Sequence, residues 1–288
     1  MLLTDPQFIK RLEMLALLAR KVLNGELKAD RKSNKKGSGT TFADYQEYTQ
    51  GDDLRNIDWN IAARLEQLVI KLFEVEEDVQ INILLDLSHS MASKQLYAKQ
   101  LAAALSYITL SNTDRLTVYG IADSLQTILK PSHGKSKIFP MLNSLENSTL
   151  FGQDTKFLTS IKTLQAQKKR PAVCVVISDF LVEEGYKKAL DLLRWAKNDV
   201  FCIQVLDPSE VNCDLRGDLE LECVESKALK KVTVSPAEAA KYNQLMAQWN
   251  ETLKHDCAKA GIGLIQTTTE TSFETVIQSI LRRGGLVA

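Results

Sequence analysis

The sequence predicts an α/β protein with a doubly wound, mostly parallel sheet and an N-terminal helical and β extension. The first observation is the rhythm from Val79 onward, where apolar runs of strand length alternate with segments of helical periodicity. Because parallel strands need crossover connections, this alternation indicates a sheet that helices cover on both faces. The second is composition, since 44% hydrophobic and 25% charged residues in a chain of 288 are typical of one large or two small globular domains.

The N-terminal elements come first in chain order. A helix is expected to begin around Pro6 and to stop near Asn24-Gly25, with one apolar face. The basic stretch Lys28–Gly39 could bind phosphate groups, but a solvated linker is the more frequent outcome for a short run of charge. A strand is expected at Leu68–Val75.

The remaining elements alternate in type. The expected strands are Val79–Leu85, Leu116–Ala122, Val173–Ile177, Val200–Leu206 and Ile262–Ile265. The expected helices are Met91–Ser111, Thr155–Gln167, Glu184–Lys197, Ala237–Lys259 and one near Ser272–Arg283. After a tight turn, Leu125–Leu129 should form an edge strand, and Asp218–Val224 with Lys230–Val234 should form a hairpin insertion. We therefore divide the chain into an N-terminal part, residues 1–78, and an α/β domain, residues 79–288.

Charge and cysteine usage exclude several classes of protein. The 36 basic residues balance the 36 acidic ones, which argues against a protein that holds nucleic acid or anionic lipid through bulk charge. No apolar run approaches the length of a membrane span, and the N-terminus lacks the pattern of a secretory signal. The 5 cysteines form no C-x-x-C pair and the 3 histidines are scattered, so neither redox nor zinc chemistry is expected. We expect a cytoplasmic protein.

Side chains with oxygen donors follow the first core strand. Asp86, Ser88 and Ser90 occupy alternate positions, and alternate residues of an extended backbone share a side. One carboxylate and two hydroxyls are hard donors that suit Mg²⁺ or Mn²⁺. The alternative is that the two serines only cap the following helix.

Two further segments bring oxygen donors toward the same edge of the sheet. Asp179 follows the strand Val173–Ile177, and the loop of residues 152–155 opens another helix. Open α/β sheets form their sites at the carboxyl ends of the strands, near the point where strand order reverses. His89 lies between the two serines and alternates with them, so its ring is expected to face solvent.

With this pattern, the region from Val79 resembles a von Willebrand factor A-type domain, whose metal-ion-dependent adhesion site uses D-x-S-x-S, a later Thr and a later Asp. The resemblance implies a metal site of Asp86, Ser88, Ser90, Thr155 and Asp179. In that family the later Thr and Asp often act through water, and one coordination position stays open for a partner's carboxylate. Relatives commonly read G-G-T-D at the threonine loop, where this chain reads G-Q-D-T. We favour Thr155, because Phe157 and Ile161 then fall where the helix needs core residues, and Asp154 is the alternative.

The segment Tyr45–Arg64 resembles the signature of the bacterial domain-of-unknown-function family 58. Residues 47–59 read E-Y-T-Q-G-D-D-L-R-N-I-D-W, and A-A-R follows at 62–64. The resemblance covers nearly the whole chain, and members are commonly encoded beside MoxR-type AAA+ ATPases with which they are thought to work. The charges of this segment could form a docking surface or a turn network that fixes it to the A-type domain. We expect Trp59 to be a packed anchor.

These resemblances imply a non-enzymatic, metal-dependent protein-interaction module, an adaptor for a MoxR-type ATPase in the assembly or maturation of protein complexes. The expected ion is Mg²⁺, with Mn²⁺ or Ca²⁺ as alternatives, and the expected contact is an acidic side chain of the ATPase or of its client. We assign no catalytic residue and no organic cofactor. The alternative is a metal-dependent hydrolase that uses Asp86, Asp179 and a metal-activated water. Against it, the sequence lacks a plausible His–Ser–acid set and a phosphate-binding glycine loop.

Overall fold

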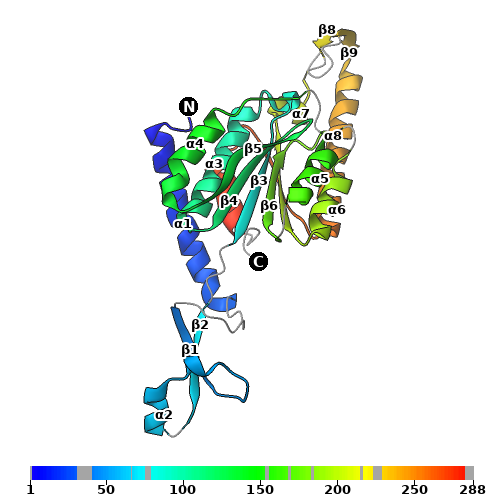
Figure 1. Cartoon of the computed structure of the whole chain (residues 1–288). Coiled ribbons are helices and arrows are strands. Elements are labelled where there is room, and N and C mark those ends of the chain that lie inside the picture. The colour runs from blue at the N-terminus through cyan, green and yellow to red at the C-terminus, as the bar shows by residue number, and fades with distance from the viewer. Residues whose placement is uncertain are drawn as a thin grey trace. The chain divides into compact units, whose positions relative to one another are not determined.

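The computed structural model forms two compact units (Figure 1). It describes residues 2–30, 41–65, 67–74, 79–152, 156–167, 170–182, 185–214, 217–222 and 229–282. The large unit comprises Met1–Leu23 and Val79–Ala288, and the small unit comprises Asn24–Asp78.

A six-stranded sheet in the order β10-β7-β6-β3-β4-β5 is the centre of the large unit. Its strands are β3 (Gln80–Asp86), β4 (Arg115–Ile121), β5 (Leu125–His133), β6 (Val173–Ser178), β7 (Asp199–Leu206) and β10 (Gly263–Thr268). The neighbours pair in parallel, except that β5 runs antiparallel to β4 at one edge. The predicted doubly wound, mostly parallel sheet is confirmed. Because the chain builds β4 and β5 on one side of β3 and then places β6 on the other, strand order reverses between β3 and β6.

Helices cover both faces of this sheet (Figure 1). One face carries α3 (Gln95–Ser111), α4 (Ile138–Glu146), α9 (Phe273–Arg282) and the first part of α1 (Pro6–Asp30), and the other carries α5 (Phe157–Gln167), α6 (Lys187–Trp195) and α8 (Pro236–Lys259). Strand β3 shows why both layers are needed. Ile83 and Leu85 pack into one apolar core and Leu84 into the other, and all three are fully buried.

The first helix differs from the sequence-based expectation in two ways. Its residues Phe8, Leu12 and Leu15 are buried against the sheet's helical layer, and Phe8 lies 5.3 Å from Phe273 between ring centroids. The first 23 residues therefore belong to the large unit, whereas the predicted division at residue 78 groups them with the N-terminal part. The predicted helix end near Asn24-Gly25 is wrong, because α1 continues to Asp30. A glycine inside a helix costs only about 1 kcal/mol, which does not by itself end one.

The small unit contains the signature segment. Its strands β1 (Thr41–Glu47) and β2 (Val69–Glu74) pair antiparallel, and between them lie a 3-10 turn, η1 (Leu54–Asn56), and α2 (Trp59–Leu65). The predicted strand at Leu68–Val75 corresponds to β2.

Asp58 organises this unit. One of its carboxylate oxygens accepts hydrogen bonds from the backbone N–H groups of Asn60 and Ile61 at the start of α2. The other accepts the Tyr45 hydroxyl at 3.2 Å and lies 3.0 Å from the Lys71 ammonium. Asp58 thus joins both strands to the helix, so this aspartate serves a turn network within the segment.

The neighbouring Trp59 is 66% exposed, so the expectation that it is a packed anchor is wrong. It occupies the first position of α2, and the start of that helix is fixed by the side chain of Asp58.

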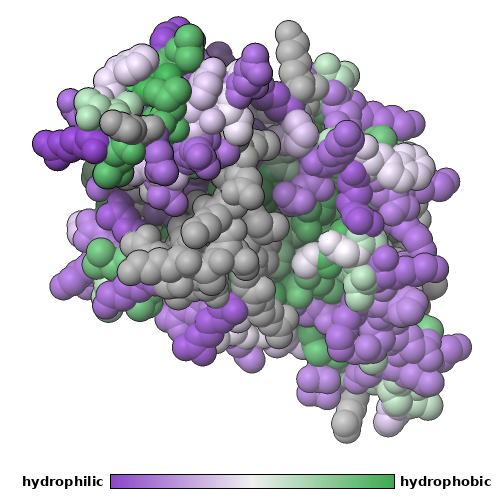
Figure 2. All heavy atoms as spheres, turned by 90° about the horizontal axis from the view of Figure 1, so that it is seen from below, coloured by the Kyte–Doolittle hydropathy of each residue, from purple (hydrophilic) through white to green (hydrophobic). Residues whose placement is uncertain are grey.

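The other described elements complete the comparison. The predicted hairpin is confirmed as β8 (Gly217–Glu222) paired antiparallel with β9 (Leu229–Val234). The short helix α7 (Pro208–Val211) and helices α2 and α4 were not expected from the sequence. Of the basic stretch Lys28–Gly39, residues 31–39 lie outside the described residues. No helix in the described part of the chain is both long and apolar enough to cross a membrane. The face drawn in Figure 2 is mainly hydrophilic, with apolar side chains in separate groups.

Candidate metal site

Asp86 is the last residue of β3, at the carboxyl edge of the sheet where strand order reverses. Its side chain is fully buried. One carboxylate oxygen accepts the Ser88 N–H at 3.0 Å and the Ser88 hydroxyl at 2.7 Å, and the other accepts the Ser178 hydroxyl at 2.6 Å. The Ser88 and Ser90 hydroxyl oxygens are 2.9 Å apart. We call Asp86, Ser88, Ser90 and Ser178 the Asp86 cluster.

The alternative role of the serines as helix caps does not account for Ser88. It precedes the 3-10 turn η2 (His89–Met91), yet its side chain makes no capping hydrogen bond to that turn. Its hydroxyl instead contacts Asp86 and Ser90. The D-x-S-x-S spacing therefore gathers oxygen atoms around one point, as a cation site requires.

The electrostatics of Asp86 also fit a cation. Burial, and after it the nearby Asp179 carboxylate, raise the pKa of this carboxyl to about 6 against the opposing hydrogen bonds from Ser178 and Ser88. An ionised Asp86 is therefore unfavourable in the protein alone. A divalent ion held by Asp86, Ser88 and Ser90 would supply the compensating positive charge.

Asp179 reaches the site from the neighbouring strand. It directly follows β6, and the next residue, Phe180, has a φ of 59°. This left-handed conformation costs a non-glycine residue about 1–2 kcal/mol. Packing holds it, because the fully buried Phe180 ring makes edge contacts with Phe157 and Tyr186 at centroid distances of 6.1 and 6.0 Å. The resulting turn presents Asp179 beside the Asp86 cluster.

A buried lysine, which sequence reasoning missed, occupies the same edge. The Lys94 ammonium lies 2.8 Å from Oδ2 of Asp179 and 2.6 Å from Oε1 of Glu210. Burial by itself lowers the pKa of Lys94, but the two carboxylates outweigh burial and raise the pKa overall, so the lysine stays charged. Glu210 is held in turn by the capping box of α7, where its other oxygen accepts the Asp207 N–H at 2.7 Å. Lys94 thus links the segments that follow β3, β6 and β7.

The threonine loop is described only at its start. Thr155 and the alternative Asp154 lie outside the described residues. Gly152 has a φ of +75°, and a Cβ there would lie 2.7 Å from the Asp123 carboxyl group, so no other residue fits without a shift. His89 is half-buried and its Nδ1 donates to the Gly152 carbonyl, so the expectation that it faces solvent is wrong. His89 connects the D-x-S-x-S turn to this loop.

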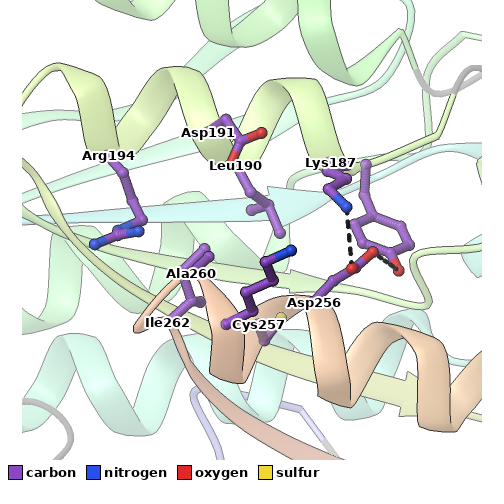
Figure 3. A pocket seen from close by; sticks show the side chains of 10 residues that line it. Lys187, Leu190, Asp191, Arg194, Asp256, Cys257, Ala260 and Ile262 are labelled. Carbon is purple, nitrogen blue, oxygen red and sulfur yellow. Dashed lines mark hydrogen bonds and ion pairs between the residues drawn. The ribbon is translucent and has the colours of Figure 1, made fainter.

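A hollow away from the Asp86 cluster lies between α6 and the C-terminal part of α8 (Figure 3). Its volume is about 240 Å³. Asp256, which lines it, accepts the Tyr186 hydroxyl at 3.3 Å and lies 3.1 Å from the Lys187 ammonium, so these polar groups are already paired with one another. None of the residues lining this hollow belongs to the Asp86 cluster. The oxygen donors that suit a cation are at the sheet edge, which remains the candidate site.

The metal site that the resemblance implies consists of hydroxyl groups and two aspartates, and it does not require three acidic, histidine or cysteine ligands. Among the described residues, no three His, Cys, Asp or Glu side chains are grouped so as to hold an ion. Of the five residues implied, Asp86, Ser88 and Ser90 lie together and Asp179 lies beside them. The oxygens of Asp179 accept the Leu181 N–H, at 3.0 Å, and the Lys94 ammonium.

The strand order, the antiparallel edge strand and the D-x-S-x-S turn at the point of reversal are the arrangement of a von Willebrand factor A-like domain. The chain belongs to the family described as "Protein of unknown function DUF58", whose model matches residues 44–252. The match includes the signature segment from Asp44 and most of the α/β domain.

Relatives occur in mycobacteria. The uncharacterized protein Rv1480 of Mycobacterium tuberculosis is 24% identical over 293 residues, which cover 98% of this chain and 92% of the relative. The uncharacterized protein MAV169 of Mycobacterium avium is 32% identical over 76 residues, which cover 26% of this chain and 44% of that protein.

Similar solved structures include BatB from Bacteroides thetaiotaomicron, with a TM-score of 0.44 and 16% identity over 71% of this chain and 96% of that one. A von Willebrand factor type A protein from Catenulispora acidiphila has a TM-score of 0.42 and 11% identity over 75% of this chain and 43% of that one. Proximal thread matrix protein 1 from the mussel byssus, with a zinc-occupied MIDAS motif, has a TM-score of 0.43 and 12% identity over 72% of this chain and 48% of that one.

Proposed function

We propose that this protein is a non-enzymatic interaction module that binds another protein through a divalent cation at the Asp86 cluster. The observation that carries the proposal is a fully buried carboxylate in direct contact with serine hydroxyls at the carboxyl edge of the sheet. Asp86, Ser88 and Ser90 would hold the ion directly. Mg²⁺ fits these hard oxygen donors best, with Mn²⁺ and Ca²⁺ as alternatives.

The charge of the donors supports a binding role for the ion. Asp86 contributes one negative charge and the serines contribute none, so a divalent ion keeps net positive charge at this site. Such an ion attracts an acidic side chain of a partner in place of a water molecule. The resemblance adds Thr155, and Asp179 acting through water.

The contacts of Asp179 support an interaction module over a metal-dependent hydrolase. A hydrolase of the kind considered above would need this carboxylate to activate a water. Asp179 is instead paired with the buried Lys94 ammonium, and taking up a proton from a water would break that ion pair and leave the ammonium's charge uncompensated by Asp179, whereas accepting a hydrogen bond from a water would not.

The family suggests the partner. Its members are commonly encoded beside MoxR-type AAA+ ATPases, and we propose that the protein serves such an ATPase or its client as an adaptor in the assembly or maturation of protein complexes. The contact on the partner would be a single Asp or Glu.

Co-precipitation from the native cell tests this function, with Mg²⁺ or EDTA present throughout. We expect wild type to retain the ATPase or its client only in Mg²⁺, and Asp86→Ala to retain neither. Asp199→Ala is the matched control, because Asp199 is an exposed aspartate at the opposite, amino end of β7. Retention of the same partner by Asp86→Ala would contradict the proposal.

A further inference from the structure

We propose that Lys94 sets the charge of the metal site: its ammonium neutralises the Asp179 carboxylate and thereby weakens binding of the divalent cation. This inference rests on the proposed function, because it concerns the ion at the Asp86 cluster. It assigns a positioning role to a residue outside the set that the resemblance implies.

The position of Lys94 is unusual for a lysine. Its side chain is 0% exposed and that of Asp179 is 2% exposed, so water screens their interaction little. Lysine is almost never fully buried unless it is paired. Here the pairing is with two carboxylates from different segments, one beside the Asp86 cluster and one on α7.

Another buried lysine of the same region shows that burial does not require such pairing. Lys99 lies on α3 and is 7% exposed. Its ammonium donates to the backbone carbonyls of Glu146 and Ser148 and not to the acids of the metal site. Lys94 is thus distinguished by its contact with Asp179.

The consequence for metal binding follows from charge. With Lys94 in place, an incoming cation meets the Asp86 cluster beside an Asp179 carboxylate that is already paired with the ammonium. Removing the ammonium would leave two nearby carboxylates of the same sign in a buried region, which increases the attraction for a divalent ion. In a poorly solvated site, one unit charge near a divalent ion changes its affinity by about tenfold or more.

Calorimetric titration with Mg²⁺ alone, and then with Mn²⁺ alone, tests this role without any partner. We expect Lys94→Met to bind the ion about tenfold more tightly than wild type, and Lys94→Arg, which keeps the charge, to bind within about threefold of wild type. Lys99→Met is the matched control, because it removes a buried ammonium of the same region and should leave the affinity unchanged.

Glu210→Gln supplies a second variant, which changes the charge of the site while Lys94 stays in place. The Glu210 side chain is 25% exposed, and its loss leaves Lys94 paired with Asp179. Because the site loses a negative charge, the affinity should fall. If the charge of the site determines the affinity, Lys94→Met should bind the ion more tightly than wild type and Glu210→Gln more weakly. A lysine that only clamps the loops would give weaker binding in both variants, and that result would overturn the proposal.

The two proposals fail in different ways. If wild type and Lys94→Met bind the ion equally, the metal site stands and the role of Lys94 is refuted. If neither binds Mg²⁺ or Mn²⁺, the metal site and the role of Lys94 are both wrong.

Discussion

Replacing Asp86 with asparagine should stabilise the metal-free protein while removing its metal site. The pKa of Asp86 is raised from 3.8 to about 6, chiefly by burial. Its folded-state pKa exceeds its unfolded-state pKa, so its contribution to stability is fully present below pH 3.8 and is lost as pH rises through 6. A difference of about two pH units corresponds to about 3 kcal/mol. Asparagine avoids this penalty but mismatches one serine donor, at about 1 kcal/mol, so a net gain of about 2 kcal/mol is expected near pH 7.5.

Urea unfolding of wild type and Asp86→Asn, in EDTA and in Mg²⁺, measures this effect. In EDTA at pH 7.5 the variant should have the larger free energy of unfolding. This advantage should shrink as pH falls and be lost near about pH 4.5, below which the mismatched serine donor leaves the variant less stable than wild type by about 1 kcal/mol. Saturating Mg²⁺ should raise the stability of wild type and leave the variant unchanged. A variant less stable than wild type in EDTA at pH 7.5 would refute the reasoning, because ionised Asp86 would then stabilise the fold without a cation.

Three further outcomes are expected. Because protons compete with the cation for Asp86, Mg²⁺ affinity should fall by up to about tenfold per pH unit below pH 6. Calorimetry at pH 7.5, 6 and 5 measures this dependence, and equal affinities at the three pH values would contradict it. Gly152→Ala should lower the free energy of unfolding by about 2 kcal/mol, since it combines a positive φ with a close approach to Asp123, and an unchanged melting temperature would count against that geometry. Thr155→Ala should weaken Mg²⁺ binding more than Asp154→Ala does. Its effect should be smaller than that of Asp86→Ala, because Thr155 is expected to act through water. A larger loss for Asp154→Ala than for Thr155→Ala would assign the loop position to Asp154.

The sheet and the centre of the site were predictable because their signals are local. Asp86, Ser88 and Ser90 are near neighbours in the sequence, so the extended end of β3 and the 3-10 turn that follows it bring them together. The placement of Asp179 needed only the rule that parallel strands end at a common edge. Both inferences depend on strand pattern and on no particular side-chain packing.

The rest of the site depends on contacts between distant segments. Lys94 meets Asp179 and Glu210 across 85 and 116 positions, and a lysine in a polar loop gives no sign that it will be buried. The left-handed conformation of Phe180 could not be predicted from the sequence either, because the packing of its ring, and not its residue type, holds that conformation. Helix α4 was missed because it contains Pro140, which a helix tolerates in its first turn.

The central claim is that a cation at the Asp86 cluster mediates binding to another protein. Its most direct test is the affinity of the purified protein for its MoxR-type ATPase, measured for wild type and for Asp86→Ala, each in Mg²⁺ and in EDTA. We predict tight binding only for wild type in Mg²⁺. Equal affinities in all four conditions would contradict the claim.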